Sequence, residues 1–391
     1  MDIVKDILIN DWFQMIVTFG LAFFITAKLM PLIIKFSNKL ELVDKPNERK
    51  VHAAAIPNLG GIGIFFGYIV ATVGWMVYYG GSKSIGSMEA ALILYGLMVL
   101  FVMGIIDDQI DMSASKKFLI QIAVAIMISA GGTRITELNG LFEIEKMHII
   151  LQYGLTIVLL VGLVNAFNLI DGVNGLAGGI AFIDAVIMGI LLYNPHAILI
   201  SLLAFGMAGA LLGFLIYNFG KAKIFMGDTG SLIIGYILAV LGILTMREGT
   251  STGGFIGSNN GLTIIVVGIL VLPVFDTLRV FARRVFIEKK SPFSPDKTHV
   301  HHLLLDTLTK KKITHKDVAI VLYIANIIII ATAFLLKDLP ASFSIPILFV
   351  IAFLFYDFRI IYDTFKLTLL GKDAKKKKED ILDDNDLLRE D

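Results

Sequence analysis

The segment SMEAALILYGLMVLFVMGIIDDQID, residues 87–111, joins a long apolar run to a cluster of three carboxylates. Residues 87–106 are long and apolar enough to cross a lipid bilayer, which takes about 20 residues of helix. The whole chain is 56% hydrophobic and only 17% charged, whereas a soluble domain is about a quarter charged. The composition predicts an integral membrane protein, so carboxylates at the end of an apolar run need a specific explanation.

Similar apolar runs recur along the chain and predict an all-α polytopic membrane protein with about eleven transmembrane helices. The first run is too long for a secretory signal and lacks a small-residue cleavage pattern. Because the chain has no cysteine, neither disulfides nor thiolate metal sites are available. We expect one membrane domain over residues 1–366, a charged tail over 367–391, and helices over 12–36, 58–79, 87–106, 116–133, 149–166, 175–193, 196–216, 230–247, 263–284, 317–337 and 343–365.

The positive charges favour one orientation in the membrane. Most of the 34 Lys and Arg residues fall in or beside the loops that would share a side with the C-terminus. Loops rich in Lys and Arg stay in the cytoplasm. We therefore expect a multi-pass protein of the cell membrane with the N-terminus outside and the C-terminus in the cytoplasm.

All the distinctive polar clusters fall in the predicted cytoplasmic loops. Asp and Asn are common helix N-caps, so any single one of them could be purely structural. Because the polar clusters all lie on one side of the membrane, they favour a shared cytoplasmic site. Polar residues at membrane depth are costly and usually face a polar cavity. The residues that abut apolar runs are Asp107, Asn168, Asp171, Asp228 and Asp276.

Clustered carboxylates without cysteine favour a hard divalent cation, Mg²⁺ or Mn²⁺. Mg²⁺ is typically held by one or two carboxylates while phosphate oxygens and waters complete its coordination, which suggests a phosphate or diphosphate substrate. Basic side chains could clamp that phosphate, although topology alone explains most of them. The candidates are Lys45, Arg49, Lys50, Lys116, Lys117, Lys221, Lys223, Arg279, Arg283 and Arg284.

Three short motifs allow both structural and functional interpretations. In DDQID, Asp107 and Asp111 would share a helix face if the helix continues, with Asp108 pointing about 100° away. In IFMGDTGS, the glycines beside Asp228 would let backbone approach a phosphate at a helix start, or would form a turn with an Asp cap. In THVHHL, contact with phosphate, sugar or nucleotide is favoured over a zinc site for His299, His301 and His302.

Five ordered motifs between residues 37 and 303 resemble those of the polyprenyl-phosphate N-acetylhexosamine-1-phosphate transferase family, closest to its WecA/TagO-like branch. The sister MraY type usually has Lys where Asp111 stands and an uninterrupted histidine triplet, which Val300 breaks here. The motifs are LVDKPNERKVHAAAIPNLGG (42–61), GIIDDQIDMSASKKFLIQ (104–121), NAFNLIDGVNGLAGG (165–179), NFGKAKIFMGDTGSL (218–232) and SPFSPDKTHVHHLL (291–304).

The resemblance implies transfer of GlcNAc-1-phosphate from UDP-GlcNAc to undecaprenyl phosphate, which gives undecaprenyl-diphosphate-GlcNAc and UMP and starts a cell-envelope polysaccharide. It implies Mg²⁺, or Mn²⁺, at Asp228 with Asn168 beside it. Asp107 and Asp108 would be catalytic residues near the lipid phosphate, either as a base or by orienting the metal or a lysine. The implied substrate-binding residues are Asp171 and Asn218 for the nucleotide, Arg279, His299, His301 and His302 for the sugar phosphate, and Asp111 and Lys116.

Two other functions are open at this stage. The same chemistry could act on another UDP-N-acetylhexosamine, including the muramoyl-pentapeptide substrate of the MraY type. A cation-coupled transporter would use buried aspartates too, but it should show inverted repeats and broken helices near the midplane. No repeat is visible, and the acidic residues lie at one end of the predicted spans. We also expect the lipid bilayer as a partner, a homodimer by analogy with the family, and no nucleic-acid partner.

Overall fold

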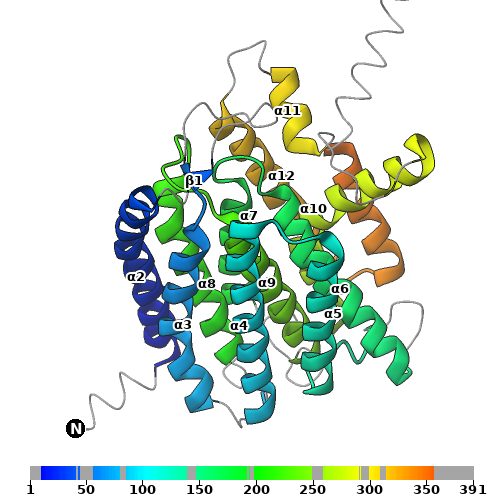
Figure 1. Cartoon of the computed structure of the whole chain (residues 1–391). Helices are drawn as coiled ribbons and strands as arrows, with labels where there is room; N and C mark the ends of the chain where they lie inside the picture. The colour runs from blue at the N-terminus through cyan, green and yellow to red at the C-terminus, as the bar shows by residue number, and fades with distance from the viewer. Residues whose placement is uncertain are drawn as a thin grey trace, which may run out of the picture.

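The computed structural model is a bundle of helices whose long axes run roughly side by side (Figure 1). It describes residues 10–40, 43–44, 56–79, 85–138, 147–191, 193, 198–248, 259–289, 291, 299–308 and 314–355. The predicted tail and the lysines and arginine at 45–50 lie outside these described residues.

Each predicted span overlaps a helix of the described chain. Eight of these helices are long and apolar enough to cross a membrane, and the apolar helices over Leu176–Leu191 and Ala341–Phe355 are shorter. The helix over Ala114–Ala130, on the predicted span 116–133, has 17 residues and is not among the eight. The polytopic membrane architecture is therefore confirmed, while the number of eleven spans and their orientation stay predictions. The helices are α2 (Asp11–Lys39), α3 (Gly60–Tyr79), α4 (Ser87–Ile110), α5 (Ala114–Ala130), α6 (Ile149–Ile170), α7 (Leu176–Leu191), α8 (Ile198–Asn218), α9 (Gly227–Glu248), α10 (Asn259–Ala282), α11 (Val300–Leu308), α12 (His315–Leu335) and the last helix (Ala341–Phe355).

Three short elements were not predicted. A two-stranded antiparallel sheet pairs β1 (Val43–Asp44) with β2 (Ile56–Pro57). The π-helix η3 (Arg283–Glu288) continues α10, and α11 is a separate short helix. These elements lie near the end of the bundle that carries the predicted polar loops, at the top of Figure 1.

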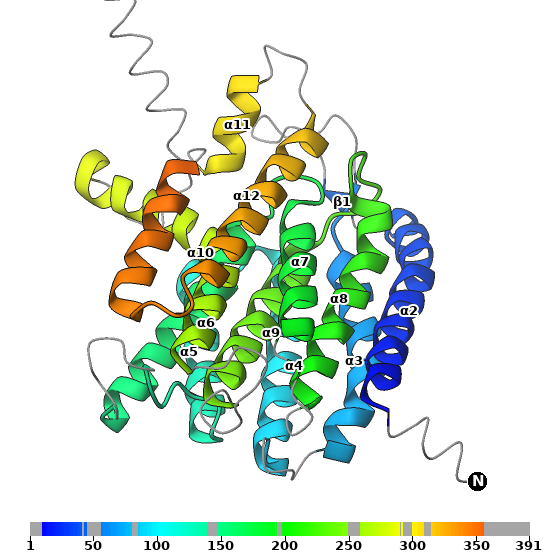
Figure 2. The ribbon, with the colours of Figure 1, turned by 180° about the vertical axis from the view of Figure 1, so that it is seen from behind.

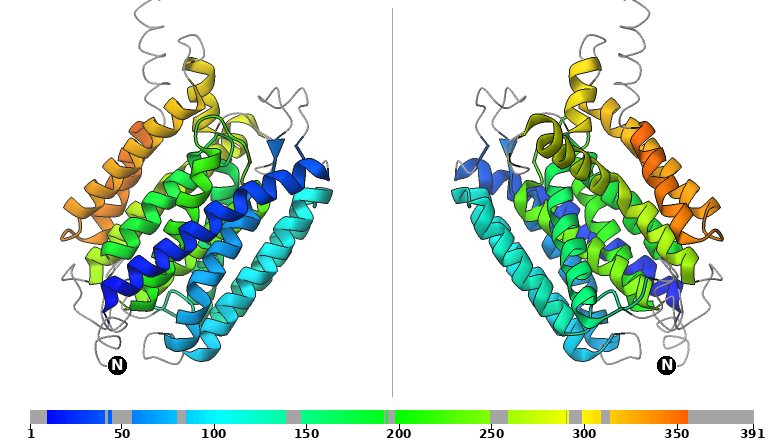
Figure 3. Two further views of the ribbon diagram at one scale, coloured as in Figure 1. Left: turned by 90° about the vertical axis from the view of Figure 1, so that its left-hand side faces the viewer. Right: turned by 90° about the vertical axis from the view of Figure 1, so that its right-hand side faces the viewer.

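The helices differ in how much of their surface the bundle covers. The apolar stretch of α9 is buried throughout, whereas only 22% of the apolar stretch of α2 is buried. Figure 3 shows α2 lying across the outside of the bundle, where it packs on α3 and α8. Figure 2 shows α12 beside α7, on the face seen from behind. The exposed Ile16, Phe24 and Leu32 of α2 give it the apolar outer surface that lipid requires.

Small residues let α3 and α4 approach the start of α9 very closely. A Cβ at Gly61 would lie 2.2 Å from the backbone nitrogen of Gly230, and one at Gly104 would lie 2.4 Å from the Cα of Thr229. Close backbone approach through small residues is typical of helix packing in membranes. This packing brings the ends of three helices together, and with them Asn58, Asp108 and Asp228.

Candidate active site

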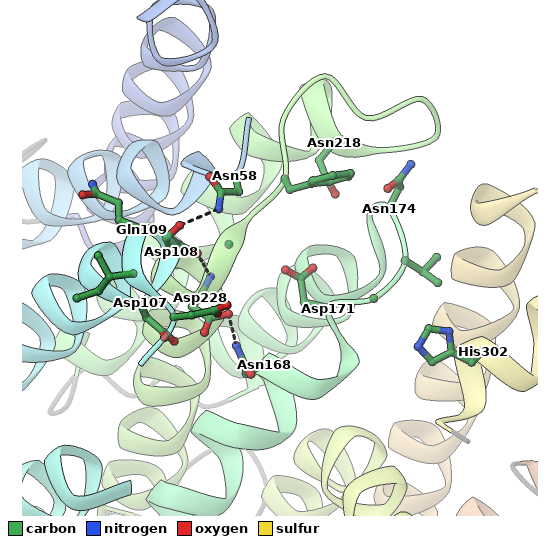
Figure 4. Close-up of a pocket in the computed structure, with 16 residues that line it drawn as sticks. Asn58, Asp107, Asp108, Gln109, Asn168, Asp171, Asn174, Asn218, Asp228 and His302 are labelled. Carbon is green, nitrogen blue, oxygen red and sulfur yellow. Dashed lines mark hydrogen bonds between the residues drawn. The ribbon is translucent and has the colours of Figure 1, made fainter. Parts of the chain in front are cut away.

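A cavity of about 700 Å³ opens at this end of the bundle. Figure 4 shows acidic and amide side chains on one side of it and His302 on the other. The predicted site residues Lys116, Arg279, His299 and His301 belong to the described chain but not to this lining. The residues that line the cavity are Asn58, Asp107, Asp108, Gln109, Ile110, Asp111, Asn168, Asp171, Gly172, Val173, Asn174, Asn218, Phe225, Gly227, Asp228 and His302.

Two carboxylates from distant helices meet at one lysine. The Nζ of Lys117, in the first turns of α5, forms ion pairs with Oδ2 of Asp107 and, at 2.9 Å, with Oδ2 of Asp228. On the other side of Asp228, Nδ2 of Asn168 donates to Oδ1 at 2.9 Å. That amide nitrogen also lies 3.0 Å from Oγ of Ser231. Asn168 thus orients the Asp228 carboxylate, and Lys117 links it to Asp107.

Asp108 caps helix α9. Its Oδ1 accepts from the backbone nitrogen of Asp228 at 2.7 Å, and its Oδ2 accepts from the backbone nitrogen of Thr229 at 3.1 Å and from Oγ1 of Thr229 at 2.6 Å. The first backbone N–H groups of a helix have no partner within the helix, and an acidic side chain there also interacts favourably with the helix dipole. Asp108 thus occupies two of the N–H groups at the start of α9, so these two are not open to a phosphate. Binding of a phosphate by the rest of the IFMGDTGS motif stays a prediction.

The DDQID motif does not form one continuous helix face. Helix α4 ends at Ile110, and Asp111 takes a left-handed conformation with φ of 51°. Oδ1 of Asp107 accepts from the backbone nitrogen of Met112 at 2.8 Å, so this carboxylate also holds the turn that follows the helix. Asp111 is exposed and lines the cavity beside the other carboxylates.

Asn218 ties two loops of the site together. Its Oδ1 accepts from the backbone nitrogen of Gly175 at 2.7 Å, and its Nδ2 donates to the backbone oxygen of Ile224 at 2.8 Å. Nearby, Nδ2 of Asn174 donates to the backbone oxygen of Gly220 at 2.9 Å. Both polar atoms of the Asn218 amide are therefore engaged in holding the loops, and the residue still forms part of the cavity wall.

The cavity concentrates negative charge. Burial, together with the carboxylates of Asp228 and Asp108, raises the pKa of Asp171 well above its usual range. A raised carboxyl pKa means that the ionised form is disfavoured where no cation compensates it. A divalent cation bound in the cavity would therefore stabilise the ionised form of these carboxylates.

The residues present fit Mg²⁺ better than zinc. Within the described chain, no group of three or more His, Cys, Asp or Glu residues is arranged to hold a metal, so the three histidines do not form a zinc site there. Mg²⁺ needs only one or two carboxylates when phosphate oxygens and waters supply the rest. Asp107 and Asp228 already converge on a single ammonium group, which is the arrangement a cation between them requires.

The histidine motif reaches the cavity through one of its three imidazoles. His302 lines the cavity, whereas His301 is buried and packs against Gly172, where an added Cβ would lie 2.3 Å from Nε2. Burial, and then the neighbouring His302, lower the pKa of His301 to about 3. His301 is therefore neutral at physiological pH. It packs beneath the cavity wall and carries no charge toward a phosphate.

Some residues of the site were not selected from the sequence. Both Lys116 and Lys117 were candidates for binding phosphate, and the resemblance implied Lys116 as the substrate-binding residue. The structure leaves Lys116 exposed and brings Lys117 to Asp107 and Asp228. Neighbouring helical residues point about 100° apart, so the rotation of α5 decides between them, and sequence alone does not reveal that rotation. For Asn58, the only indication in the sequence was its place in the PNLGG motif. Its Nδ2 lies 3.4 Å from the backbone oxygen of Asp108.

The sequence is similar to those of known proteins over most of its length. Residues 90–246 match the family described as glycosyl transferase family 4. The chain is 33% identical over 340 residues to a probable undecaprenyl-phosphate N-acetylglucosaminyl 1-phosphate transferase of Bacillus subtilis (strain 168), covering 86% of this chain and 89% of the relative. It is 30% identical to the undecaprenyl-phosphate alpha-N-acetylglucosaminyl 1-phosphate transferase of Escherichia coli O157:H7, covering 83% and 85%. It is 31% identical to a decaprenyl-phosphate N-acetylglucosaminephosphotransferase of Mycobacterium leprae (strain TN), covering 75% and 76%. The chain is a member of glycosyl transferase family 4.

Proposed function

We propose that this protein transfers GlcNAc-1-phosphate from UDP-GlcNAc to undecaprenyl phosphate, releasing UMP and starting a cell-envelope polysaccharide. The observation that carries the proposal is the joining of Asp107, Lys117, Asp228 and Asn168 in one cavity. This cavity lies at one end of a membrane bundle, in a chain 33% identical to a relative named for that reaction. A lipid-anchored acceptor and a water-soluble donor can meet only at such a boundary.

The reaction is a single displacement. An oxygen of the lipid phosphate attacks the β-phosphorus of UDP-GlcNAc, and the bond from that phosphorus to the bridging oxygen breaks, so UMP leaves with the electron pair. Mg²⁺ held by Asp228 and Asp107 would neutralise charge on the diphosphate and on the departing UMP. Phosphoryl transfer depends mainly on positioning and charge neutralisation, and both require the carboxylates to be held in place.

The side chains around the reacting centre divide the positioning between them. Lys117 keeps Asp107 and Asp228 together before substrate arrives, and it is a cation that can turn to a phosphate oxygen. Asn168 orients Asp228, while Asp108 fixes the backbone from which Asp228 projects. A general base is not needed, since the second pKa of a phosphate monoester is about 6 and its oxygens are already ionised at pH 7. The role of Asp107 is therefore to help hold the cation and to position Lys117.

The far wall of the cavity suits the donor substrate. Asp171 and His302 face the same space as Asp228 (Figure 4), and both offer polar groups to a sugar or a nucleotide. Asn218 contributes by shaping the loops there. We place this face in the cytoplasm, because Lys and Arg are concentrated in the loops on the same side. A homodimer stays a prediction.

One transfer assay tests the proposal. Purified protein in detergent receives UDP-[¹⁴C]GlcNAc, undecaprenyl phosphate and Mg²⁺, and lipid-linked label and UMP are measured. We expect both products in equal amounts. Label transferred only from UDP-N-acetylmuramoyl-pentapeptide would move the protein to the sister branch. An absence of transfer from either donor would refute the enzymatic function.

A further inference from the structure

Asp276 is a buried carboxylate of α10 that lies outside the lining of the cavity and outside the carboxylate cluster. Only 1% of its surface is exposed. It accepts hydrogen bonds from three groups: Nδ1 of His299 at 2.8 Å, the backbone nitrogen of Val300 at 3.1 Å and Nη2 of Arg279 at 3.2 Å. A buried carboxylate is costly unless it is paired and hydrogen-bonded. Because both of its oxygens accept hydrogen bonds, Asp276 holds the groups around it in fixed positions.

Two of the three donors, His299 and Val300, tie α10 to the start of α11, while Arg279 belongs to α10 itself. Val300 is the first residue of α11, so the bond to its backbone nitrogen satisfies one of the N–H groups that a helix start leaves without a partner. The bond to His299 holds the residue immediately before that helix. The carboxylate can only accept, so Nδ1 of His299 carries the hydrogen. One carboxylate thus sets both the position of α11 and the ring orientation of His299.

From His299 a stack of imidazoles leads to the cavity. The rings of His299 and His301 are nearly parallel with centroids 5.9 Å apart, and those of His301 and His302 are 4.3 Å apart. His301 is wedged against Gly172 of the cavity wall, and His302 lines the cavity itself. Movement of α11 or of the His299 ring would therefore be passed directly to His302.

We propose that Asp276 is a positioning residue for the donor substrate: it docks α11 and the imidazole stack so that His302 faces the end of the cavity that takes the sugar nucleotide. The proposal rests on the transferase function proposed above. Asp276 is not a catalytic residue, because its three contacts are protein groups and it lies behind the histidines. Its effect should fall on the use of UDP-GlcNAc and not on the lipid acceptor, whose phosphate the family resemblance implies to lie near Asp107, across the cavity from His302 (Figure 4).

The test compares kinetic constants in the Asp276→Asn variant. The carboxamide keeps the shape but replaces one acceptor by a donor. Its NH₂ group either opposes the donors of Val300 and Arg279 or bonds to Nδ1 of His299 only in the other tautomer of that ring, so the original set of contacts is lost in both orientations. Loss of a buried hydrogen bond to a charged group corresponds to about a tenfold effect or more. We expect KM for UDP-GlcNAc to rise about tenfold, with KM for undecaprenyl phosphate changed less than about twofold.

The matched control is Asp184→Asn. Asp184 is equally buried and is also paired, with Nδ2 of Asn326 at 2.7 Å, but it lies within α7, away from the histidines. Both KM values should stay within about twofold of the parent. If the Asp276→Asn protein is not recovered folded, His299→Phe removes the same contact from the opposite side, keeps an aromatic ring in the stack, and should give the same selective rise.

A double-variant cycle with His302→Ala separates this positioning role from general destabilisation. If Asp276 acts through His302, the double variant should have the same KM for UDP-GlcNAc as His302→Ala alone, whereas independent effects would multiply. Multiplying effects, an equal rise of both KM values, or no rise in either variant would overturn the inference. Those outcomes require an active parent enzyme. A parent without transfer activity would instead refute the proposed function.

Discussion

The two adjacent aspartates of the DDQID motif should fail in different ways when each is changed to asparagine. Asp108 accepts three hydrogen bonds at the start of α9, the most buried helix of the described bundle. Removal of a helix cap costs about 0.5–2 kcal/mol, and a single hydrogen bond to a charged group contributes about 1.5–3 kcal/mol. Asparagine keeps one acceptor oxygen. We therefore expect Asp108→Asn to lower the free energy of unfolding by about 2 kcal/mol.

Compared with Asp108→Asn, Asp107→Asn should lower stability less. Its amide oxygen can still accept from the backbone nitrogen of Met112, and Lys117 keeps its pair with Asp228. Loss of one of the two carboxylate partners of Lys117 should cost about 1 kcal/mol of stability. The variant should lose about a hundredfold in kcat, because it weakens the cation site. The assays are denaturant unfolding in mixed micelles and transfer kinetics on the same preparations.

The reverse pattern would refute this division of roles. An Asp108→Asn protein that is as stable as the parent yet inactive would place Asp108 in the chemistry. An Asp107→Asn protein that unfolds easily would make Asp107 a structural residue.

Three further predictions concern the same site. Lys117→Met should lower kcat about a hundredfold, while Lys116→Met, on the exposed face of the same helix, should stay within about twofold; equal losses would mean that the rotation of α5 is wrong. Removal of divalent cations with EDTA should abolish transfer, and added Mg²⁺ or Mn²⁺ should restore it; unchanged turnover in EDTA would exclude a required cation. Gly104→Leu should prevent folding, because its Cβ would lie 2.4 Å from the Cα of Thr229; a stable, active variant would contradict the close packing of α4 on α9.

The sequence predicted the features that depend on local pattern. Apolar length alone located a helix at every predicted span, since a helix in lipid must satisfy its own backbone and be apolar over its whole length. The alternation of loops between two sides then predicted that Asp107, Asn168, Asp171 and Asp228 would share one face, and the structure places them in one cavity.

Features that depend on tertiary contacts were beyond the sequence pattern. Asp107 and Asp108 are chemically identical neighbours, and only the packing of α4 on α9 turns one to Lys117 and the other to the α9 backbone. Asp276 was noted as an aspartate beside an apolar run, but two of its three partners, His299 and Val300, lie more than 20 residues away along the chain. Each of these distinctions depends on how a helix is rotated about its axis. The sequence does not reveal that rotation when apolar residues cover nearly all faces of the helix.

In the proposed transfer of GlcNAc-1-phosphate, the phosphate next to the sugar moves to the lipid together with the sugar. The most direct test of this transfer uses two preparations of UDP-GlcNAc, one labelled with ³²P at the β-phosphate and the other at the α-phosphate, with undecaprenyl phosphate and Mg²⁺. We predict that the β-label enters the lipid fraction and that the α-label appears in UMP, with both signals lost in Asp228→Ala. Release of the β-label in water-soluble UDP, with the sugar alone on the lipid, would show that the sugar moves without its phosphate and would refute the proposed reaction.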